Sequence, residues 1–257
     1  MLKQLIKRGF RRAGYNLERL PVQAAVYDQD GLWTVHNHEF MQDPRFHAAY
    51  QRGLDAALGL DYLGPWRLHI ALWAASSAAR LRGDFVECGV NRGVVSSAIM
   101  RYLDWDALGR TFYLLDTFAG LELELLTAGE RARGAVATNR EFLGTGRYVT
   151  GVESVRQNFA EWKNVRIVQG TIPGTLPEVD AKELAYLHLD MNCTRPETDA
   201  LRYFWDRLVP GALILLDDYA YDGYRESKLG MDELAREMGF GIASLPTGQG
   251  LIVKPPR

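Results

Sequence analysis

The sequence predicts an α/β fold: a doubly wound, seven-stranded, mostly parallel sheet preceded by an N-terminal helical extension. Five short apolar runs, separated by segments with helical spacing, are typical of buried parallel strands. The last two β runs, residues 240–245 and 250–254, are joined by a turn too short for a helical crossover, so they must pair antiparallel. Acidic residues stand where several of the runs end, which is where ligands bind in such a sheet.

Length and composition fit one such domain with an extension. The 257 residues are enough to bury a full core, and 30 Lys+Arg against 32 Asp+Glu provide no generic basic surface for nucleic acid. The chain has no secretory apolar core at its start and no run of about 20 apolar residues, so no membrane-spanning helix is expected. Cys88 and Cys193 fit neither a CxxC nor a zinc spacing, which predicts reduced thiols in a cytoplasmic protein.

The extension is predicted to cover residues 1–65. Its first part, residues 1–15, has the pattern of a basic amphipathic helix, which either lies on an anionic membrane at its inner face or docks a partner such as a second copy in a homodimer. A solvated surface helix is the simpler interpretation. Glycines and prolines punctuate residues 21–65, which predicts an irregular segment with short helical pieces, including 44–58. The apolar face of the first helix comprises Leu2, Leu5, Ile6 and Phe10, and its basic residues are Lys3, Lys7, Arg8, Arg11 and Arg12.

Residues 66–257 are predicted to form the main domain. Helical spacing and high alanine content predict a helix over 66–81, which Gly83 ends. Glycines recur in residues 121–149, which are expected to be less regular and partly mobile. The predicted parallel strands are 84–90, 111–118, 165–170, 185–190 and 212–218, and the helices after them are 94–105, 154–162, 198–208 and 227–239.

Three aspartates follow two of the predicted strands. Asp190 ends the run 185–190, and Asp217 and Asp218 end the run 211–219. If the two strands are neighbours, about 4.8 Å apart, the three carboxylates meet at one edge of the sheet. Three anions so close raise one another's pKa unless a cation lies among them, and Mg²⁺ is a cation that prefers oxygen ligands. The alternative is that Asp217 caps the following element while Asp190 is only solvated.

A Glu-x-Gly-x-x-x-Gly pattern, formed by Glu87, Gly89 and Gly93, follows the first strand. The two glycines permit a tight turn and the close approach of a ligand or a helix. The spacing is not the GxGxxG of dinucleotide sites, and Glu87 would repel a pyrophosphate. The acid suits a ligand that carries an amino group and no phosphate, such as S-adenosylmethionine. A plain strand–helix turn is the alternative.

The next two strands carry further candidates for a nucleoside site. Asp116 ends the second strand, where a carboxylate of this fold receives two ribose hydroxyls. Phe118 is placed to cover an adenine, and Gly170 follows the third strand where the adenine edge is expected. These residues lie at consecutive strand ends, which indicates one binding site; otherwise, Asp116 is a turn-forming residue.

The segments GDFVECGVNRG, FYLLDTFAGL, VQGTIPGTLP, LHLDMN and LVPGALILLDDY resemble the macrocin/mycinamicin/novobiocin-type sugar O-methyltransferases. The resemblance covers residues 66–257. It implies a Rossmann-like class I methyltransferase fold, S-adenosylmethionine as methyl donor, Mg²⁺ or another divalent cation, and a sugar hydroxyl of a glycan or natural product as acceptor. By position it implies that Asp190, Asp217 and Asp218 hold the metal, and that Glu87, Gly89, Gly93, Asp116, Thr117, Phe118 and Gly170 line the cofactor.

One position departs from that family. Its members carry a second Asp two residues after the first metal ligand, as the proposed general base, and here this residue is Asn192. An amide takes up no proton at neutral pH, so Asn192 is expected to orient the acceptor hydroxyl and the base to come from elsewhere. His36 and His38 are the candidates if their segment closes over the site as a lid; the alternative is a polar surface loop. His188 is interpreted as a buried core histidine.

Three other functions stay open on the sequence alone. The first is an O-methyltransferase of a small catechol-like acceptor, which would use the same ligands. The second is a nicotinamide oxidoreductase, which the missing GxGxxG disfavours. The third is a non-catalytic S-adenosylmethionine-binding protein, which Asn192 makes plausible. The aromatic residues that are candidates to stack on a sugar are Trp33, Trp66, Tyr219, Tyr221 and Tyr224.

Overall fold

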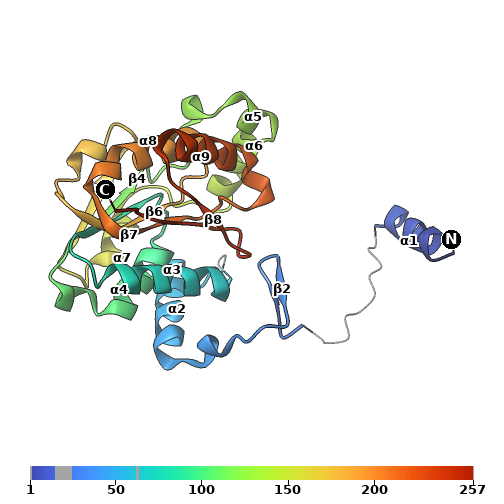
Figure 1. Cartoon of the computed structure of the whole chain (residues 1–257), viewed down its shortest axis with the longest axis horizontal. Coiled ribbons are helices and arrows are strands. Elements are labelled where there is room, and N and C mark those ends of the chain that lie inside the picture. The colour runs from blue at the N-terminus through green and yellow to red at the C-terminus, as the bar shows by residue number, and fades with distance from the viewer. Residues whose placement is uncertain (1, 15–24, 62–63, 257) are drawn as a thin grey trace. The chain divides into compact units, whose positions relative to one another are not determined.

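The computed structural model describes residues 2–14, 25–61 and 64–256, which form two compact units, Met1–His38 and Glu39–Arg257 (Figure 1). The larger unit therefore starts well before residue 66. Residues 39–56 belong to it because Phe46 and Ala49 are buried in its hydrophobic core. Parts of the predicted extension, residues 15–24 and 62–63, lie outside the described residues.

The smaller unit contains a helix and a hairpin. The helix predicted near the N-terminus is present as α1 (Leu2–Arg12). Strands β1 (Tyr27–Gln29) and β2 (Leu32–Thr34) pair antiparallel, which the sequence analysis did not predict. The sequence signal for this hairpin is the dipeptide Asp30-Gly31, because Asp-Gly is favoured in tight hairpin turns. In the structure the two residues have φ of 51° and 70°, as such a turn requires.

The larger unit is built on a seven-stranded sheet with the order β5-β4-β3-β6-β7-β9-β8. Strand β9 runs antiparallel to both of its neighbours, and the strands from β5 to β7 are parallel. The predicted doubly wound sheet with one reversed strand is therefore confirmed. The strands are β3 (Asp84–Cys88), β4 (Phe112–Asp116), β5 (Val165–Gln169), β6 (Leu184–Leu189), β7 (Leu208–Leu216), β8 (Ala243–Ser244) and β9 (Gly250–Val253).

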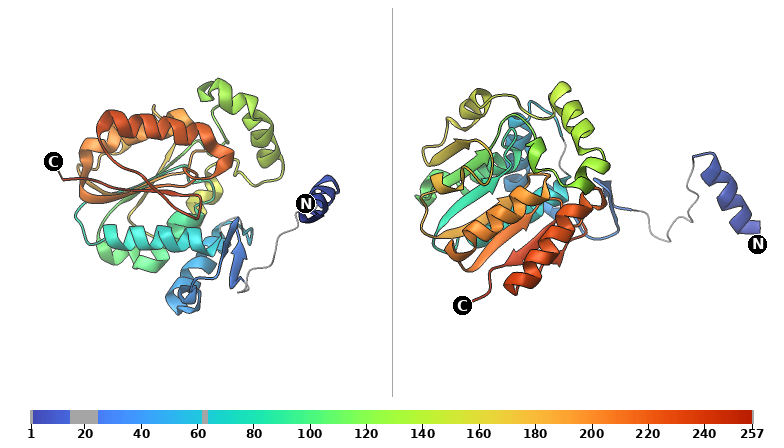
Figure 2. Two further views of the ribbon diagram at one scale, coloured as in Figure 1. Left: turned by 45° about the vertical axis from the view of Figure 1, so that its right-hand side comes forward. Right: turned by 90° about the horizontal axis from the view of Figure 1, so that it is seen from above.

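Helices cover both faces of this sheet (Figure 2). One face packs against α2 (Pro44–Ala56), α3 (Pro65–Ala78), α4 (Val94–Leu103) and α7 (Glu153–Phe159). The other packs against α8 (Thr194–Phe204) and α9 (Arg225–Met238). Among the described helices, none has the length and apolar character needed to cross a membrane. Cys88 and Cys193 are both buried and free of a disulfide bond, as their spacing predicted.

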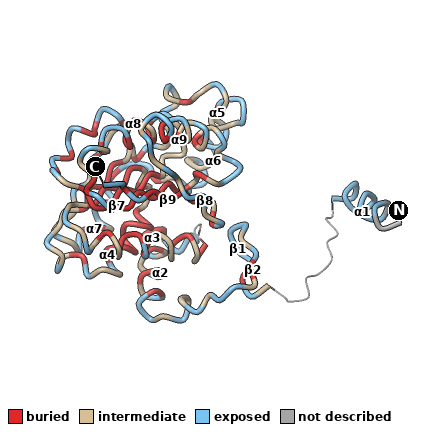
Figure 3. The backbone as a smooth tube through the Cα atoms, in the orientation of Figure 1, coloured by how far each residue is buried: buried red, intermediate tan, exposed pale blue. Residues whose placement is uncertain are grey.

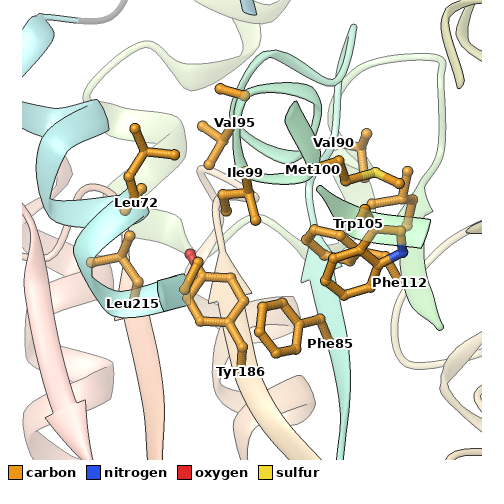
Figure 4. Close-up of a cluster of buried hydrophobic side chains, with 14 of the residues drawn as sticks. Leu72, Phe85, Val90, Val95, Ile99, Met100, Trp105, Phe112, Tyr186 and Leu215 are labelled. Carbon is orange, nitrogen blue, oxygen red and sulfur yellow. The ribbon is translucent and has the colours of Figure 1, made fainter. Parts of the chain in front are cut away.

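The central strands are buried on both faces (Figure 3). Under α3 and α4 the core is aromatic (Figure 4): the ring of Phe85 lies 5.0 Å from that of Trp105, 5.7 Å from Phe112 and 5.1 Å from Tyr186. Trp105 is fully buried, and its indole N–H donates to the carbonyl of Asn164 at 3.0 Å. Large rings packed at these spacings hold neighbouring strands in a fixed register, so the strand ends form a rigid platform.

The segment 121–149 is more regular than its glycines predicted, because it contains α5 (Ala128–Ala132) and α6 (Ala135–Gly144). Glu130 anchors it: one carboxylate oxygen accepts from the backbone N–H of Thr127, and the other from the N–H and hydroxyl of Thr194, each at 2.7 Å. Burial would raise the pKa of Glu130, but these hydrogen bonds outweigh it and lower that pKa. The prediction of an irregular segment is wrong here, and the missed signal was the Thr-x-x-Glu capping box.

Candidate active site

The three predicted aspartates meet at the carboxyl edge of the sheet. Strands β6 and β7 are parallel neighbours whose last partners are Leu189 and Leu216, so Asp190 and Asp217 follow opposite each other. One carboxylate oxygen from each of Asp190, Asp217 and Asp218 lies within 4.8 Å of the others. The expected juxtaposition of these strand ends is therefore present, and it brings three acidic side chains to one point.

A buried ionic chain runs beneath this acidic cluster. Glu87 and His188 are register partners on β3 and β6, and His188 Nδ1 lies 2.8 Å from Glu87 Oε1. On its other side, His188 Nε2 lies 3.7 Å from Asp217 Oδ1. Burial alone would lower the pKa of His188, but the carboxylates of Asp217 and Glu87 raise it to about 10. The predicted core histidine is buried, and it lies between the carboxylates of Glu87 and Asp217, which favour its protonated form.

Arg67 supplies a permanent cation, which no pattern in the sequence indicated. It lies in the first turn of α3, and its Nη2 donates to the carbonyl of Asp217 at 2.8 Å and to Asp218 Oδ1 at 3.0 Å. The same nitrogen also donates to Asp217 Oδ2. Gln249 donates to the remaining oxygen, Asp217 Oδ1, at 3.1 Å. The Asp217 side chain is thus held on both oxygens.

The carboxylates of the cluster differ in how far nearby positive charges and hydrogen bonds offset their negative charge. Burial would raise the pKa of Asp217, but Arg67 and His188 bring it well below its ordinary value. The pKa of Asp190 is raised instead, first by burial and then by repulsion from Asp217 and Asp218. Negative charge is therefore least compensated at Asp190, and a cation is favoured there.

The acidic cluster fits a divalent cation. Its three carboxylates provide the oxygen donors that Mg²⁺ prefers, and they lie close enough together to share one ion. Arg67 contacts the cluster directly, and any charge on the nearby His188 is balanced by Glu87, so the cluster with Arg67 has a formal charge of −2. Asp190, Asp217 and Asp218 are thus suited to hold such an ion, which would balance that charge.

A pocket with about 750 Å³ of empty space, including its opening to solvent, reaches this cluster. Six of the predicted site residues line it, and they come from both the nucleoside end and the metal end. They are Gly89, Asp116, Thr117, Gly170, Asp190 and Asn192, and other lining residues include Leu121, Leu125, Tyr148, Thr171 and Ile172.

The glycine turn of this pocket is held by Asp116. Its Oδ2 accepts from the backbone N–H groups of Val90 and Asn91 at 2.7 Å each, and its Oδ1 accepts from the N–H of Phe118 at 2.6 Å. These bonds use most of the acceptor capacity of the carboxylate. Asp116 therefore organises the loop that shapes the pocket, in addition to any contact with a ligand.

Three predicted cofactor residues lie outside the pocket lining. The Phe118 ring is 1% exposed and packs in the hydrophobic core, so its face is not available to an adenine. Gly93 serves helix packing, because a Cβ there would lie 2.4 Å from the Phe159 ring. Glu87 is 2% exposed and bonded to His188 through Oε1, while its Oε2 has no hydrogen-bond partner among the residues that the structure describes.

Asn192 lies in the pocket beside the metal end. Its side-chain N–H donates to Asp190 Oδ1 at 3.3 Å, and its φ of 55° is one that asparagine tolerates well. Asn192 therefore orients Asp190. His36 and His38 follow β2 in the smaller unit, so their role as a base stays a prediction.

The aromatic residues near the acidic cluster differ in part from those that the sequence predicted. The pKa values of Tyr148 and Tyr224 are raised, chiefly by burial and further by Asp218 and Asp190, so both phenols lie near the acidic cluster. Tyr148 was not predicted, whereas Tyr224 was. The Tyr219 hydroxyl instead donates to Asp232 at 2.5 Å, and Trp66 packs edge-on against Phe40.

Comparisons with known proteins agree with this arrangement. A family model described as Macrocin-O-methyltransferase (TylF) matches residues 27–231. The 8-demethyl-8-(2,3-dimethoxy-alpha-L-rhamnosyl)-tetracenomycin-C 4'-O-methyltransferase of Streptomyces olivaceus is 32% identical over 155 residues, which is 56% of either chain. The Mycinamicin III 3''-O-methyltransferase of Micromonospora griseorubida is 26% identical over 174 residues, 64% of this chain and 67% of that one. The chain thus spans little more than half the length of the first relative.

Solved structures share the fold. The O-methyltransferase NovP superposes with a TM-score of 0.64 at 23% identity, over 75% of this chain and 81% of that one. The likeness extends to the sheet and its flanking helices, which is the architecture that the sequence predicted.

Proposed function

Because the chain belongs to the macrocin O-methyltransferase family, as its motifs suggested, we propose that it transfers a methyl group from S-adenosylmethionine to a sugar hydroxyl. The acceptor is a glycosylated small molecule, and a divalent cation such as Mg²⁺ takes part. The family is one of S-adenosylmethionine-dependent methyltransferases. The rhamnosyl group in the name of the relative from Streptomyces olivaceus supports the acceptor class.

The observation that carries the proposal is the continuity of the pocket from the glycine turn to the acidic cluster. Gly89 and Asp116 line one end, and Asp190 and Asn192 line the other. Methyl transfer is an in-line displacement, for which a protein mainly has to hold two reactants in contact. A pocket that joins the two ends allows this.

In this reaction the residues of the pocket and of the acidic cluster would have different roles. The turn held by Asp116 shapes the cofactor end, and the sulfonium of the cofactor supplies the methyl group. Asp190, Asp217 and Asp218 would hold the cation, which when bound lowers the pKa of a coordinated hydroxyl. Asn192 keeps Asp190 in place and donates to the acceptor oxygen. Tyr148 and Tyr224 flank the cluster, where they would exclude water from the reacting groups.

A transfer assay with methyl-labelled S-adenosylmethionine tests the proposal. We expect label to enter rhamnosylated or otherwise glycosylated natural products but not their aglycones, to disappear with chelator, and to return with Mg²⁺. Transfer to a catechol without a sugar would redirect the proposal to the small-acceptor class. Failure of S-adenosylhomocysteine to bind in calorimetry, or transfer that resists the chelator, would contradict the cofactor or the cation respectively.

Substituting Asn192 tests whether it orients or deprotonates. We expect Asn192→Ala to lower turnover about tenfold, because the loss is one hydrogen bond to Asp190 and one to the acceptor. Asn192→Asp should not exceed the wild-type rate, since it loses the donor to Asp190. An Asn192→Ala enzyme as fast as wild type would rule out the orienting role. If His36 and His38 supply the base, His36→Gln with His38→Gln should slow turnover more than Asn192→Ala does.

We further propose that α1 attaches the protein to anionic membranes. Residues 2–12 contain five Lys and Arg and no acidic residue, whereas the rest of the chain holds the other 25 basic residues and all 32 acidic ones. Ile6 and Phe10, on the apolar side of the helix, are each 46% exposed. Such a helix binds by apolar burial together with attraction to acidic lipids.

Vesicle sedimentation tests this attachment. We expect the full chain to sediment with vesicles that contain phosphatidylglycerol, to bind purely zwitterionic vesicles at least about tenfold more weakly, and to detach as salt rises. Ile6→Asp should abolish sedimentation, whereas Lys163→Gln, outside α1, makes the same change of −1 in net charge and should not. Equal binding to both kinds of vesicle, or unchanged binding of Ile6→Asp, would contradict the proposal.

A further inference from the structure

The acidic cluster has a cation of its own, and it comes from a distant helix. Arg67 reaches from α3 to the end of β7, where one nitrogen contacts Asp217 and Asp218. The side chain of Arg67 is 9% exposed, and those of Asp217 and Asp218 are 7% and 13% exposed. A guanidinium does not lose its proton in proteins, so this positive charge is permanent.

Arg67 is also fixed in place, because its backbone is tied to the same cluster. Gln249, which is 1% exposed, donates through one side-chain nitrogen to Asp217 Oδ1 at 3.1 Å and to the carbonyl oxygen of Arg67 at 3.5 Å. Arg67, Gln249 and Asp217 therefore form one buried unit. The charge of Arg67 stays at the cluster and cannot swing into solvent.

We infer that Arg67 is a positioning residue that matches the charge of the acidic cluster to a divalent ion and holds Asp217 and Asp218 in their orientation. Three carboxylates alone carry −3, and with Arg67 they carry −2, since any charge on His188 is balanced by Glu87. The inference rests on the proposed metal site. A fixed positive charge by itself opposes the binding of a cation. The proposed role explains why an arginine is nevertheless buried beside the three aspartates.

The physical basis is Coulombic. Removing one positive charge near a bound ion favours a trivalent ion over a divalent one, since the energy gained scales with the charge of the ion. The ratio of the Mg²⁺ and Tb³⁺ dissociation constants therefore reports on Arg67 without any need for catalysis. A residue with only a structural role would change both affinities together, or the stability of the fold, but not their ratio.

Metal titration of the full-length chain tests the inference, with Mg²⁺ measured by calorimetry and Tb³⁺ by luminescence. We expect Arg67→Gln to raise the preference for Tb³⁺ over Mg²⁺ at least about tenfold, and Arg67→Lys, which keeps the charge, to leave it within about threefold of wild type. Arg52→Gln is the matched control, because Arg52 pairs with Glu161 at 2.8 Å and not with the cluster. It should leave the ratio unchanged.

A compensating pair keeps the test decisive if Arg67→Gln alone folds poorly. Asp218→Asn should lower the preference for Tb³⁺, and Arg67→Gln combined with Asp218→Asn restores −2 and should restore the wild-type ratio. A double variant that fails to restore it, or an unchanged ratio in folded Arg67→Gln, would overturn the inference while leaving the metal site intact. A wild-type chain that binds neither ion removes the metal from the proposed function, and this inference with it.

Discussion

Replacing Asp190 by asparagine is expected to lower metal-dependent methyl transfer at least about 100-fold while the fold stays intact. Asp190 is the carboxylate of the cluster with the least compensation, so its charge matters most for a bound cation. S-adenosylhomocysteine should still bind, because the glycine turn at Gly89 and Asp116 is unchanged. Turnover with and without chelator, together with calorimetry of the cofactor product, measures both effects.

The stability of the same variant separates a functional role from a structural one. In the absence of metal, Asp190→Asn removes one of three neighbouring anions, so its free energy of unfolding should equal or exceed that of wild type. Asp217→Asn is the contrasting variant. It removes the buried carboxylate that Arg67 and His188 share, leaving Arg67 with Asp218 and His188 with Glu87, and should destabilise the fold by about 3 kcal/mol. Chelator-sensitive turnover at the wild-type rate in Asp190→Asn would exclude Asp190 as a metal ligand.

Gly89→Ala is expected to have the largest effect on stability, with a loss of more than about 3 kcal/mol in the free energy of unfolding or failure to fold. Its φ is 88°, and a Cβ there would lie 1.9 Å from the carbonyl oxygen of Asp190. That oxygen belongs to the backbone, so the ends of β3 and β6 would have to separate. The separation would also displace the carboxylate of Asp190 and open the pocket.

Gly134→Ala is the matched control for this substitution. Gly134 has a φ of 93°, but a Cβ there would meet no atom within 4 Å. Its free energy of unfolding should fall only by about 1–2 kcal/mol, the backbone strain that a left-handed conformation imposes on alanine. Urea unfolding followed by circular dichroism compares the two. An equal loss in both variants would show that close packing of β3 and β6 at Gly89 is not what requires glycine.

Much of the fold could be predicted because its signals are local. The apolar runs that became β6 and β7 place Asp190 and Asp217 at strand ends, and the rules for parallel sheets bring such ends to one edge. The glycine turn and Asp116 follow from the same reasoning. The segment 121–149 was misjudged for a local reason as well, since the capping box at Thr127 and Glu130 outweighed its glycines.

The partners of the site residues could not be predicted in this way. Asn192 was recognised as a departure from the family pattern. The burial of Phe118 in the core was not predicted, because the sequence at a strand end does not determine the direction in which the chain turns next. The roles of Glu87 and Gly93 changed for a similar reason. The side chains that contact them, His188 and Phe159, belong to other elements of the chain.

The sequence by itself determined the order of strands and helices, the reversed strand β9, and the gathering of acidic residues at one edge, because hydrophobic periodicity and connection length decide these features. Only the tertiary structure decided which basic side chains pair with these acidic residues. Arg67 and Asp217 are 150 residues apart in the chain, and Glu87 and His188 are 101 apart. No local pattern encodes such pairs. They exist because α3 packs on the face of the sheet to which the register of β3, β6 and β7 directs the acidic side chains.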